Sequence, residues 1–385
     1  MRYLLFRLKR FCGFVIGFVF FISGILKLMD PVGSGMVMKE YMEFLHIGFL
    51  ESAAKTFGTS FALLESLIGA ALITGVWRKI TASIAVGMQT FFTLLTLLLV
   101  ILKPEMDCGC FGEAIHLTHG ETFIKNLIIL ASLLIYYIPI KYLGETKKKK
   151  YISFTLVSFS TCAFALYSLL YIPMVDFTDF KPGTKINSNT ETADTYEATF
   201  VYSKDGKEGR FFLENLPDTT WTFVRTEMSE TKDKKNSIAV ISIQNKNGEY
   251  ADSLLKSGRI MAITVYKETL SLKDTKELNT FIADAKKKGF SPIVLTSTHL
   301  EGIHAQTYSC DYKTLITLNR SNGGVTYIND GIIIRKWAKR ALPDLEDLAM
   351  LSEENPTDSF IGRDTGTNLA FQGFMLYVFA VMLLL

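Results

Sequence analysis

The sequence predicts a multi-domain membrane protein, in which an all-α transmembrane four-helix bundle with extra spans carries an α/β domain outside the membrane. The first observation is composition: a chain of 385 residues that is 49% hydrophobic, with a mean hydropathy of +0.24, is too apolar for an ordinary soluble or disordered protein. The second is patterning, because apolar residues gather in runs that can cross about 30 Å of hydrocarbon, whereas residues 176–364 are polar. The formal net charge of +3 gives no support to a nucleic-acid partner.

Six apolar runs have the length that a transmembrane helix needs. The first four, at about residues 11–29, 60–77, 80–102 and 121–140, form the predicted bundle within residues 1–145, and residues 151–175 and 366–385 are the fifth and sixth spans. The first run also resembles a signal peptide, because a basic segment precedes it. No A-x-A-like cleavage site follows that run, so we favour a membrane span.

Basic residues set the expected orientation. Lys and Arg are concentrated before the first span, between the second and third, and between the fourth and fifth, at Arg2, Arg7, Lys9, Arg10, Arg78, Lys79, Lys141 and residues 147–150. The positive-inside rule places these three ends, and with them the N-terminus, in the cytoplasm. Residues 30–59, 103–120 and 176–364 are then extracytoplasmic, since long translocated segments are exempt from the charge count.

The outer polar segment divides into two predicted parts. Residues 176–235 contain three short β-prone runs separated by turn-forming sequences, which predicts a small antiparallel β meander. Residues 236–355 alternate strands and helices, beginning with a strand at 238–243. They include a parallel crossover through the helix 273–288 and a hairpin at Asn329-Asp330-Gly331. The resulting order, βαβαββα, is that of a thioredoxin-like domain.

This predicted domain lacks the residues of a redox-active thioredoxin. The segment from Lys267 to Ser271, where Cys-x-x-Cys would lie, contains no cysteine, and the turn at 321–325 contains no proline. Cys310 is the only thiol of this domain. It is either a partner thiol for a mixed disulfide or a lone buried structural cysteine.

Cys108 and Cys110 are the best candidates for redox chemistry among the five cysteines. They lie in the sequence Asp107-Cys108-Gly109-Cys110-Phe111-Gly112, on the expected extracytoplasmic side just after the third span. A disulfide between positions i and i+2 closes a small ring that departs from relaxed geometry, and strained, exposed disulfides are the labile and catalytic ones. Gly109 supplies the backbone freedom that such a ring needs.

Two other interpretations of this cysteine pair stay open. The pair could be a structural clip that shapes the loop, or it could bind zinc together with His116 and His119, which follow at usable spacings. Cys12 and Cys162 lie inside the first and fifth spans. We expect these two thiols to behave as small buried hydrophobes.

Lys27 and Glu65 are ionisable residues at similar predicted depth near the outer membrane surface. Lys27 ends the first span, which runs outward, and Glu65 follows early in the second span, which runs inward. An ion pair would relieve the burial cost of both charges, and holding the bundle together is one interpretation. The other is that Glu65 carries protons for redox chemistry at the cysteine pair, with His46 a weaker candidate for that role.

Several motifs resemble one membrane-protein superfamily. The stretch from Ser23 to Pro31, the membrane Glu65 followed by Gly69 and Gly75, and the run from Asp107 to Glu113 resemble the DoxX and MauE (methylamine utilisation) superfamily of small membrane bundles. The outer segment, through Ile172 to Phe177, Thr220 to Val224 and Arg320 to Gly324, resembles DoxX-family proteins of Bacteroides-type bacteria, which carry a degenerate thioredoxin-like domain. The resemblance implies a location in the bacterial cytoplasmic (inner) membrane.

The resemblance also implies a chemistry. Such a bundle is similar in plan to the vitamin K epoxide reductase group, where a cysteine pair at the outer end of the helices exchanges electrons with a quinone. The MauE branch is associated with forming disulfides in a periplasmic partner. Vitamin K epoxide reductases carry Cys-x-x-Cys and an additional loop pair, whereas only Cys108 and Cys110 are present here.

The leading hypothesis is therefore a membrane thiol–disulfide oxidoreductase or maturation factor. The expected catalytic residues are Cys108, Cys110 and Glu65, supported by Lys27, Asp107, Gly109, Phe111 and Gly112, with Cys310 as the candidate partner thiol. A quinone is the candidate cofactor, and an extracytoplasmic protein is the expected client. The rival hypothesis is a non-enzymatic membrane scaffold whose outer domain docks a partner.

Overall fold

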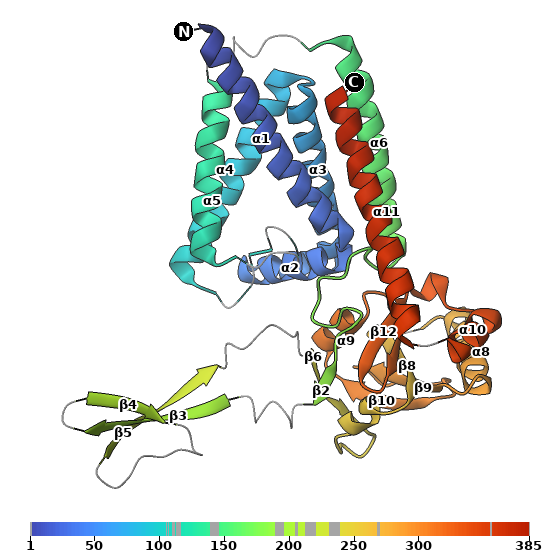
Figure 1. The fold of residues 1–385 in the computed structure, drawn as a ribbon. Coiled ribbons are helices and arrows are strands. Elements are labelled where there is room, and N and C mark those ends of the chain that lie inside the picture. Colours follow the sequence, from blue (N-terminus) through green and yellow to red (C-terminus); the bar gives the residue numbers. More distant parts are fainter. Residues whose placement is uncertain are drawn as a thin grey trace. The chain divides into compact units, whose positions relative to one another are not determined.

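The computed structural model (Figure 1) describes residues 2–104, 106, 108–109, 112, 117–138, 146–188, 196–204, 207–211, 221–230, 239–267, 270–354 and 356–384. The chain forms two compact units. The first contains Met1–Thr178, Trp337–Ala341 and Ile361–Leu385, and the second contains Asp179–Lys336 and Leu342–Phe360.

Five helices among the described residues are long and apolar enough to cross a membrane, which indicates a multi-pass membrane protein and agrees with the first five predicted spans. They belong to α1 (Arg2–Met29), α3 (Ala54–Thr74), α4 (Arg78–Leu102), α5 (His119–Tyr137) and α6 (Lys148–Leu170). Local signals set their ends. Helix α3 stops where Gly75 adopts a left-handed conformation with φ of 72°, and α5 begins with a capping box between Thr118 and Glu121.

Helices α1 and α3 approach each other closely because glycines line their contact. A Cβ atom at Gly69 of α3 would collide with the backbone of Phe21, and a Cβ atom at Gly24 of α1 would collide with Ser66. Small residues favour such contacts between membrane helices, where packing rather than the hydrophobic effect drives association. The contact fixes the depth of α1 relative to α3, and with it the depth of the charged residues on both helices.

The sixth predicted span falls in α11 (Pro356–Leu384), whose apolar part among the described residues, Leu369–Leu384, is shorter than the five above. Helix α11 lies beside α6 (Figure 1). Ser153 Oγ donates a hydrogen bond to the Val381 carbonyl at 2.7 Å, and Lys150 Nζ donates to the Met382 carbonyl at 3.1 Å. These bonds satisfy carbonyls at the end of α11. That α11 crosses the membrane stays a prediction.

The segment 30–59, predicted only as an outer loop, is largely helical. It contains α2 (Pro31–Phe44) and a short 3₁₀ helix, Gly48–Ala53, and α2 lies across one end of the bundle (Figure 1). Asp30 caps α2 by accepting a hydrogen bond from the Gly33 amide at 2.9 Å, and Pro31 suits the first helical position. Helix α2 therefore covers the end of the bundle where Lys27 lies.

A six-stranded mixed sheet forms the centre of the second unit, in the order β12-β11-β8-β9-β10-β7. Its strands are β7 (Ile243–Gln244), β8 (Arg259–Val265), β9 (Ser291–Thr296), β10 (Gln306–Cys310), β11 (Gly324–Asn329) and β12 (Ile332–Trp337). Strands β8 and β9 are parallel and are joined through α8 (Leu272–Lys287), which confirms the predicted crossover. Strand β11 runs antiparallel to β8. The thioredoxin-like identity of this mixed-sheet domain stays a prediction.

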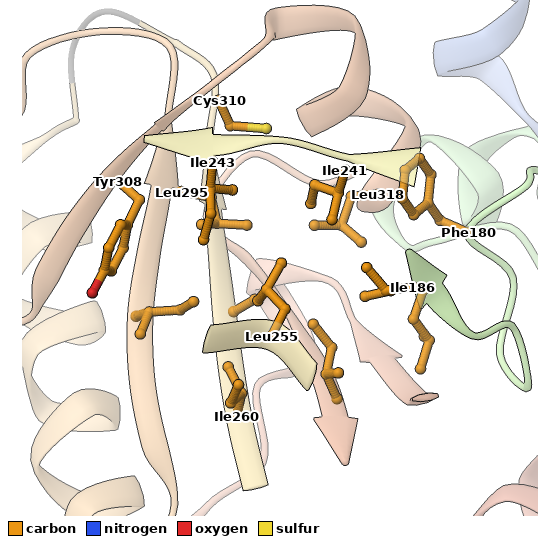
Figure 2. Close-up of a cluster of buried hydrophobic side chains, with 14 of the residues drawn as sticks. Phe180, Ile186, Ile241, Ile243, Leu255, Ile260, Leu295, Tyr308, Cys310 and Leu318 are labelled. Carbon is orange, nitrogen blue, oxygen red and sulfur yellow. The ribbon is translucent and has the colours of Figure 1, made fainter. Parts of the chain in front are cut away.

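Two details of this domain differ from the prediction. Strand β10 was not predicted, and the single strand expected at 238–243 is divided into β6 (Ala239–Ile241) and β7. Strand β6 pairs with β2 (Ile186–Ser188), whereas β7 pairs with β10. Helices α9 (Tyr312–Leu318) and α10 (Leu345–Glu353) complete the domain. Figure 2 shows its buried cluster, in which Ile186 and Ile241 from the small sheet lie near Leu255 and Ile243; burial of such apolar surface is the main force that stabilises a domain.

The predicted β meander is a three-stranded antiparallel sheet with a different strand order. Strands β3 (Tyr196–Lys204), β4 (Lys207–Phe211) and β5 (Thr222–Glu230) are arranged β4-β3-β5. Strand β3 pairs with both neighbours, whereas a meander would place β4 in the centre. Strands β4 and β5 therefore form the two edges of this sheet.

Candidate functional site

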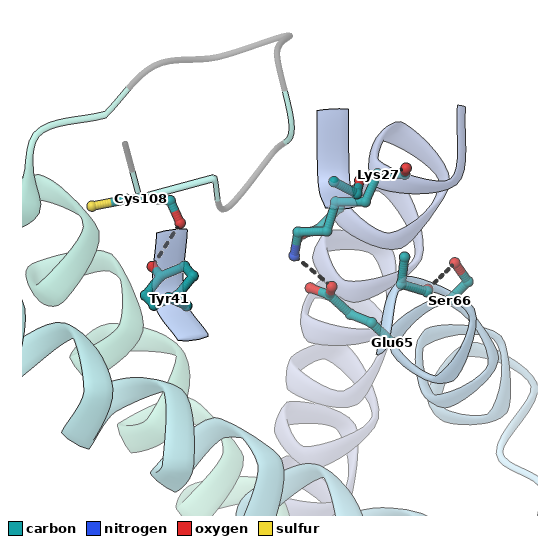
Figure 3. Close-up of polar contacts among 8 residues, drawn as sticks. Lys27, Tyr41, Glu65, Ser66 and Cys108 are labelled. Carbon is teal, nitrogen blue, oxygen red and sulfur yellow. Dashed lines mark hydrogen bonds and ion pairs between the residues drawn. The ribbon is translucent and has the colours of Figure 1, made fainter. Parts of the chain in front are cut away.

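Lys27 and Glu65 form an ion pair between α1 and α3 (Figure 3). The Lys27 Nζ atom lies 2.6 Å from Glu65 Oε2, and the two side chains are 18% and 10% exposed. Lys27 Nζ also donates to Ser23 Oγ at 3.2 Å and lies 5.9 Å from the centroid of the Phe92 ring. The pairing expected from their similar depth is therefore present, and the charge of Lys27 is shared among three neighbours.

The loop at Cys108 is packed against α2 and α1. Tyr41 of α2 donates its hydroxyl hydrogen to the Cys108 carbonyl at 2.9 Å (Figure 3), and Cys108 is 6% exposed. Gly109 has a φ of 57°, and a Cβ atom there would collide with Val37, so both backbone conformation and space require glycine. Gly112 has a φ of 59° and would place a Cβ atom 3.5 Å from the Leu26 carbonyl oxygen.

Part of this loop lies outside the described residues. Asp107, Cys110, Phe111 and His116 belong to that part, so the predicted pairing of the two cysteines and the zinc alternative both stay predictions. His119 is described, and its Nε2 atom lies 3.0 Å from the Met106 carbonyl oxygen, within hydrogen-bond distance.

A cavity of about 300 Å³ lies inside the first unit, between α1, α2, α3, α4 and α5. Cys108 and Gly109 form part of its wall, and Lys27 and Glu65 form another part. Six aromatic side chains line it: Phe20, Tyr41, Phe57, Phe61, Phe91 and Phe92. Mostly apolar cavities of this size with a few convergent polar groups are typical ligand sites.

A second polar group lines the same cavity, and the sequence prediction missed it. Gln89 of α4 donates from Nε2 to the backbone oxygen of Asn126 at 3.1 Å, and Asn126 of α5 donates from Nδ2 to Thr96 Oγ1 at 3.2 Å. Gln89 and Asn126 are only 3% and 4% exposed. The available signal was two amide side chains inside predicted spans, where polar residues are costly and mark functional positions.

The remaining predicted thiols and bases are not among the residues that line this cavity. Cys310 is 6% exposed, and burial, followed by the nearby Asp311 carboxylate, raises the pKa of its thiol to about 12. Both effects disfavour the reactive thiolate, and the role of Cys310 as a partner thiol stays a prediction. Cys12 is half-buried, but Cys162 is exposed on its helix and not buried as expected. His46 is exposed in the turn after α2.

Comparisons with known proteins support the N-terminal part of this account. Residues 4–139 match the family described as methylamine utilisation protein MauE, which is the region that holds α1 to α5, the ion pair and the cavity. Residues 196–232 match a domain of unknown function, DUF8463, over the three-stranded sheet. No curated protein matches the chain.

Proposed function

We propose that this chain is a membrane thiol–disulfide oxidoreductase or maturation factor of the MauE type. In this proposal the Cys108/Cys110 pair accepts electrons from thiols of an extracytoplasmic client protein. The N-terminus lies in the cytoplasm of a bacterial cell, the bundle lies in its inner membrane, and residues 176–364 are extracytoplasmic. The thioredoxin-like domain binds the client, because it has no dithiol of its own for the reaction.

The proposed reaction consists of two half-reactions, each of which transfers two electrons. A client thiolate attacks one sulfur of the Cys108–Cys110 disulfide to form a mixed disulfide, and a second client thiolate then displaces the cysteine sulfur. The client leaves with a disulfide, and the pair holds two thiols. A membrane-soluble quinone takes two electrons and two protons from these thiols, which restores the disulfide and yields a hydroquinone. Glu65, beside the same cavity, is the proposed proton carrier.

One observation carries this proposal: Cys108 and the Lys27–Glu65 ion pair line the same aromatic-walled cavity. A structural clip would need neither a cavity beside the thiol nor an ionisable group on the cavity wall. An electron exchange between a thiol and a membrane-soluble ring needs both, because the ring must reach the sulfur and the protons must leave an apolar site. The family match over residues 4–139 supports the same interpretation.

The test is oxidation of a reduced client by membranes that contain the full chain. Cys108→Ser and Cys110→Ser should each abolish disulfide formation in co-expressed periplasmic proteins that wild-type membranes oxidise, as read by thiol alkylation and gel shift. Cys162→Ser is the matched control, because this thiol is exposed on α6, and it should keep full activity. Full activity in Cys110→Ser would contradict the mechanism and favour the scaffold hypothesis.

A further inference from the structure

The amide pair Gln89 and Asn126 has hydrogen-bonding capacity that the protein leaves unused. One N–H group of each amide has an acceptor, but neither the Gln89 Oε1 atom nor the Asn126 Oδ1 atom has a hydrogen-bond partner among the described residues. Both side chains are more than nine-tenths buried and both line the cavity. An amide oxygen without a partner in a mostly apolar cavity is costly.

Neighbouring bonds fix which way the two amides point. Thr96 donates its hydroxyl hydrogen to backbone carbonyls of its own helix, at 2.8 Å to Phe92 O and 3.1 Å to Thr93 O. Its oxygen can therefore only accept from Asn126, so Asn126 must present its N–H₂ group to Thr96 and keep Oδ1 on the other side. Gln89 is fixed in the same way, because its partner is a backbone carbonyl oxygen, which cannot donate.

Hydrogen bonding between helices α4 and α5 does not explain a role for the two side-chain amide oxygens, Gln89 Oε1 and Asn126 Oδ1. Side-chain amides often join membrane helices by hydrogen bonds, and the two N–H groups do so here between α4 and α5. That role is complete without either carbonyl oxygen. The oxygens remain available to a ligand in the cavity, and such a ligand must offer hydrogen-bond donors to them.

We propose that Gln89 and Asn126 form a subsite for a hydroxyl-bearing aromatic ring, of the hydroquinone or phenol class, inside the cavity. The aromatic residues that line the cavity suit a flat ring, and two acceptor oxygens suit two O–H groups. In the reaction proposed above, this subsite recognises the reduced form of the electron carrier, since a quinone offers no hydrogen-bond donor to the two amide oxygens. The identity of the ring rests on the proposed function, but the existence of the subsite rests on the two amides alone.

The test compares ligands that differ only in their donors. The probes are 2-decyl-1,4-hydroquinone and its 1,4-dimethoxy analogue, and binding is measured by equilibrium dialysis against the full chain in nanodiscs under reducing conditions. The chain carries Cys108→Ser so that it cannot oxidise the probe. We expect the hydroquinone to bind at least tenfold more tightly than the dimethoxy compound, since one hydrogen bond is worth about tenfold in affinity.

Two variants and one control test whether the preference for the hydroquinone depends on Gln89 and Asn126. Gln89→Met and Asn126→Leu should each reduce the preference for the hydroquinone to below threefold, whereas Ser132→Leu, at a half-buried position of α5 outside the cavity lining, should keep it. Equal binding of the two probes by the Cys108→Ser chain would overturn the subsite without the need for either variant. So would a preference that survives in both variants. Because no thiol reaction is measured, a positive result stands even where the Cys108/Cys110 pair proves not to cycle, and a negative result leaves the proposed thiol chemistry intact.

Discussion

Substitution of the Lys27–Glu65 ion pair has a predictable effect on stability. Glu65→Gln leaves the Lys27 ammonium in a site where its side chain is 18% exposed. Its remaining partners in the described part of the chain are Ser23 and the Phe92 ring. Removing one member of a buried ion pair costs about 3–5 kcal/mol. Because Lys27 keeps some exposure and one hydrogen bond, we expect a smaller loss than this, about 2–3 kcal/mol of unfolding free energy.

A double-mutant cycle separates this interaction from general damage to the bundle. Lys27→Met alone should cost a similar amount, since it leaves an unpaired Glu65 carboxylate. The double variant, Lys27→Met with Glu65→Gln, should lie within about 1 kcal/mol of the wild type, because no buried charge remains. The two single losses sum to about 4–6 kcal/mol, so the expected coupling between the two positions is about 3–6 kcal/mol, far above the coupling of independent sites.

The assay is denaturant unfolding of the full chain in detergent, followed by circular dichroism. Lys39→Met serves as the matched control, because Lys39 and Glu51 form an ion pair at 3.3 Å with side chains 47% and 35% exposed. An exposed pair of this kind contributes at most about 1 kcal/mol. If the unfolding free energies lost by the two single variants simply add in the double variant, the ion pair contributes no specific stabilisation and the argument from burial is wrong.

Three further predictions concern the Cys108 loop and the second unit. Gly109→Ala should slow oxidation of the client at least tenfold, because its φ of 57° and the contact with Val37 force the loop to move; combining it with Val37→Ala should restore part of the rate, and no slowing would contradict the packing. Tyr41→Phe removes the 2.9 Å hydrogen bond to the Cys108 carbonyl and should lower the opening free energy of the loop by about 1 kcal/mol, measured as faster amide exchange; unchanged exchange would contradict it. Since burial and Asp311 raise the pKa of Cys310 to about 12, the thiolate is scarce at neutral pH, so maleimide should not label Cys310 in the folded chain between pH 7 and 8.5 and should label it fully after unfolding; rapid labelling of the folded chain would show an accessible thiol.

The sequence predicted the features that depend on local composition. Long apolar runs identify α1, α3, α4, α5 and α6 because the bilayer imposes a minimum helix length. The positions of Lys27 and Glu65 at similar predicted depth in adjacent spans were enough to expect their ion pair. The parallel pairing of β8 and β9 followed from the helix between them, since short connections with a crossover helix have few alternatives.

Features that depend on distant contacts were not predictable in this way. Helix α2 has no clear apolar stripe, and its start signal, Asp30 followed by Pro31, is short. Strand β10 alternates polar and apolar residues over only five positions. The order β4-β3-β5 depends on which edges meet, which local patterns do not encode. The amides of Gln89 and Asn126 can be identified as cavity-lining groups only when α4 and α5 pack against each other and leave a cavity beside them.

The central claim is that the Cys108/Cys110 pair cycles with a membrane-soluble quinone, and the redox state of the two thiols in intact membranes tests it most directly. Differential alkylation followed by mass spectrometry should find the pair oxidised in normal membranes and reduced after quinone depletion. A pair whose redox state is the same with and without quinone would contradict the account.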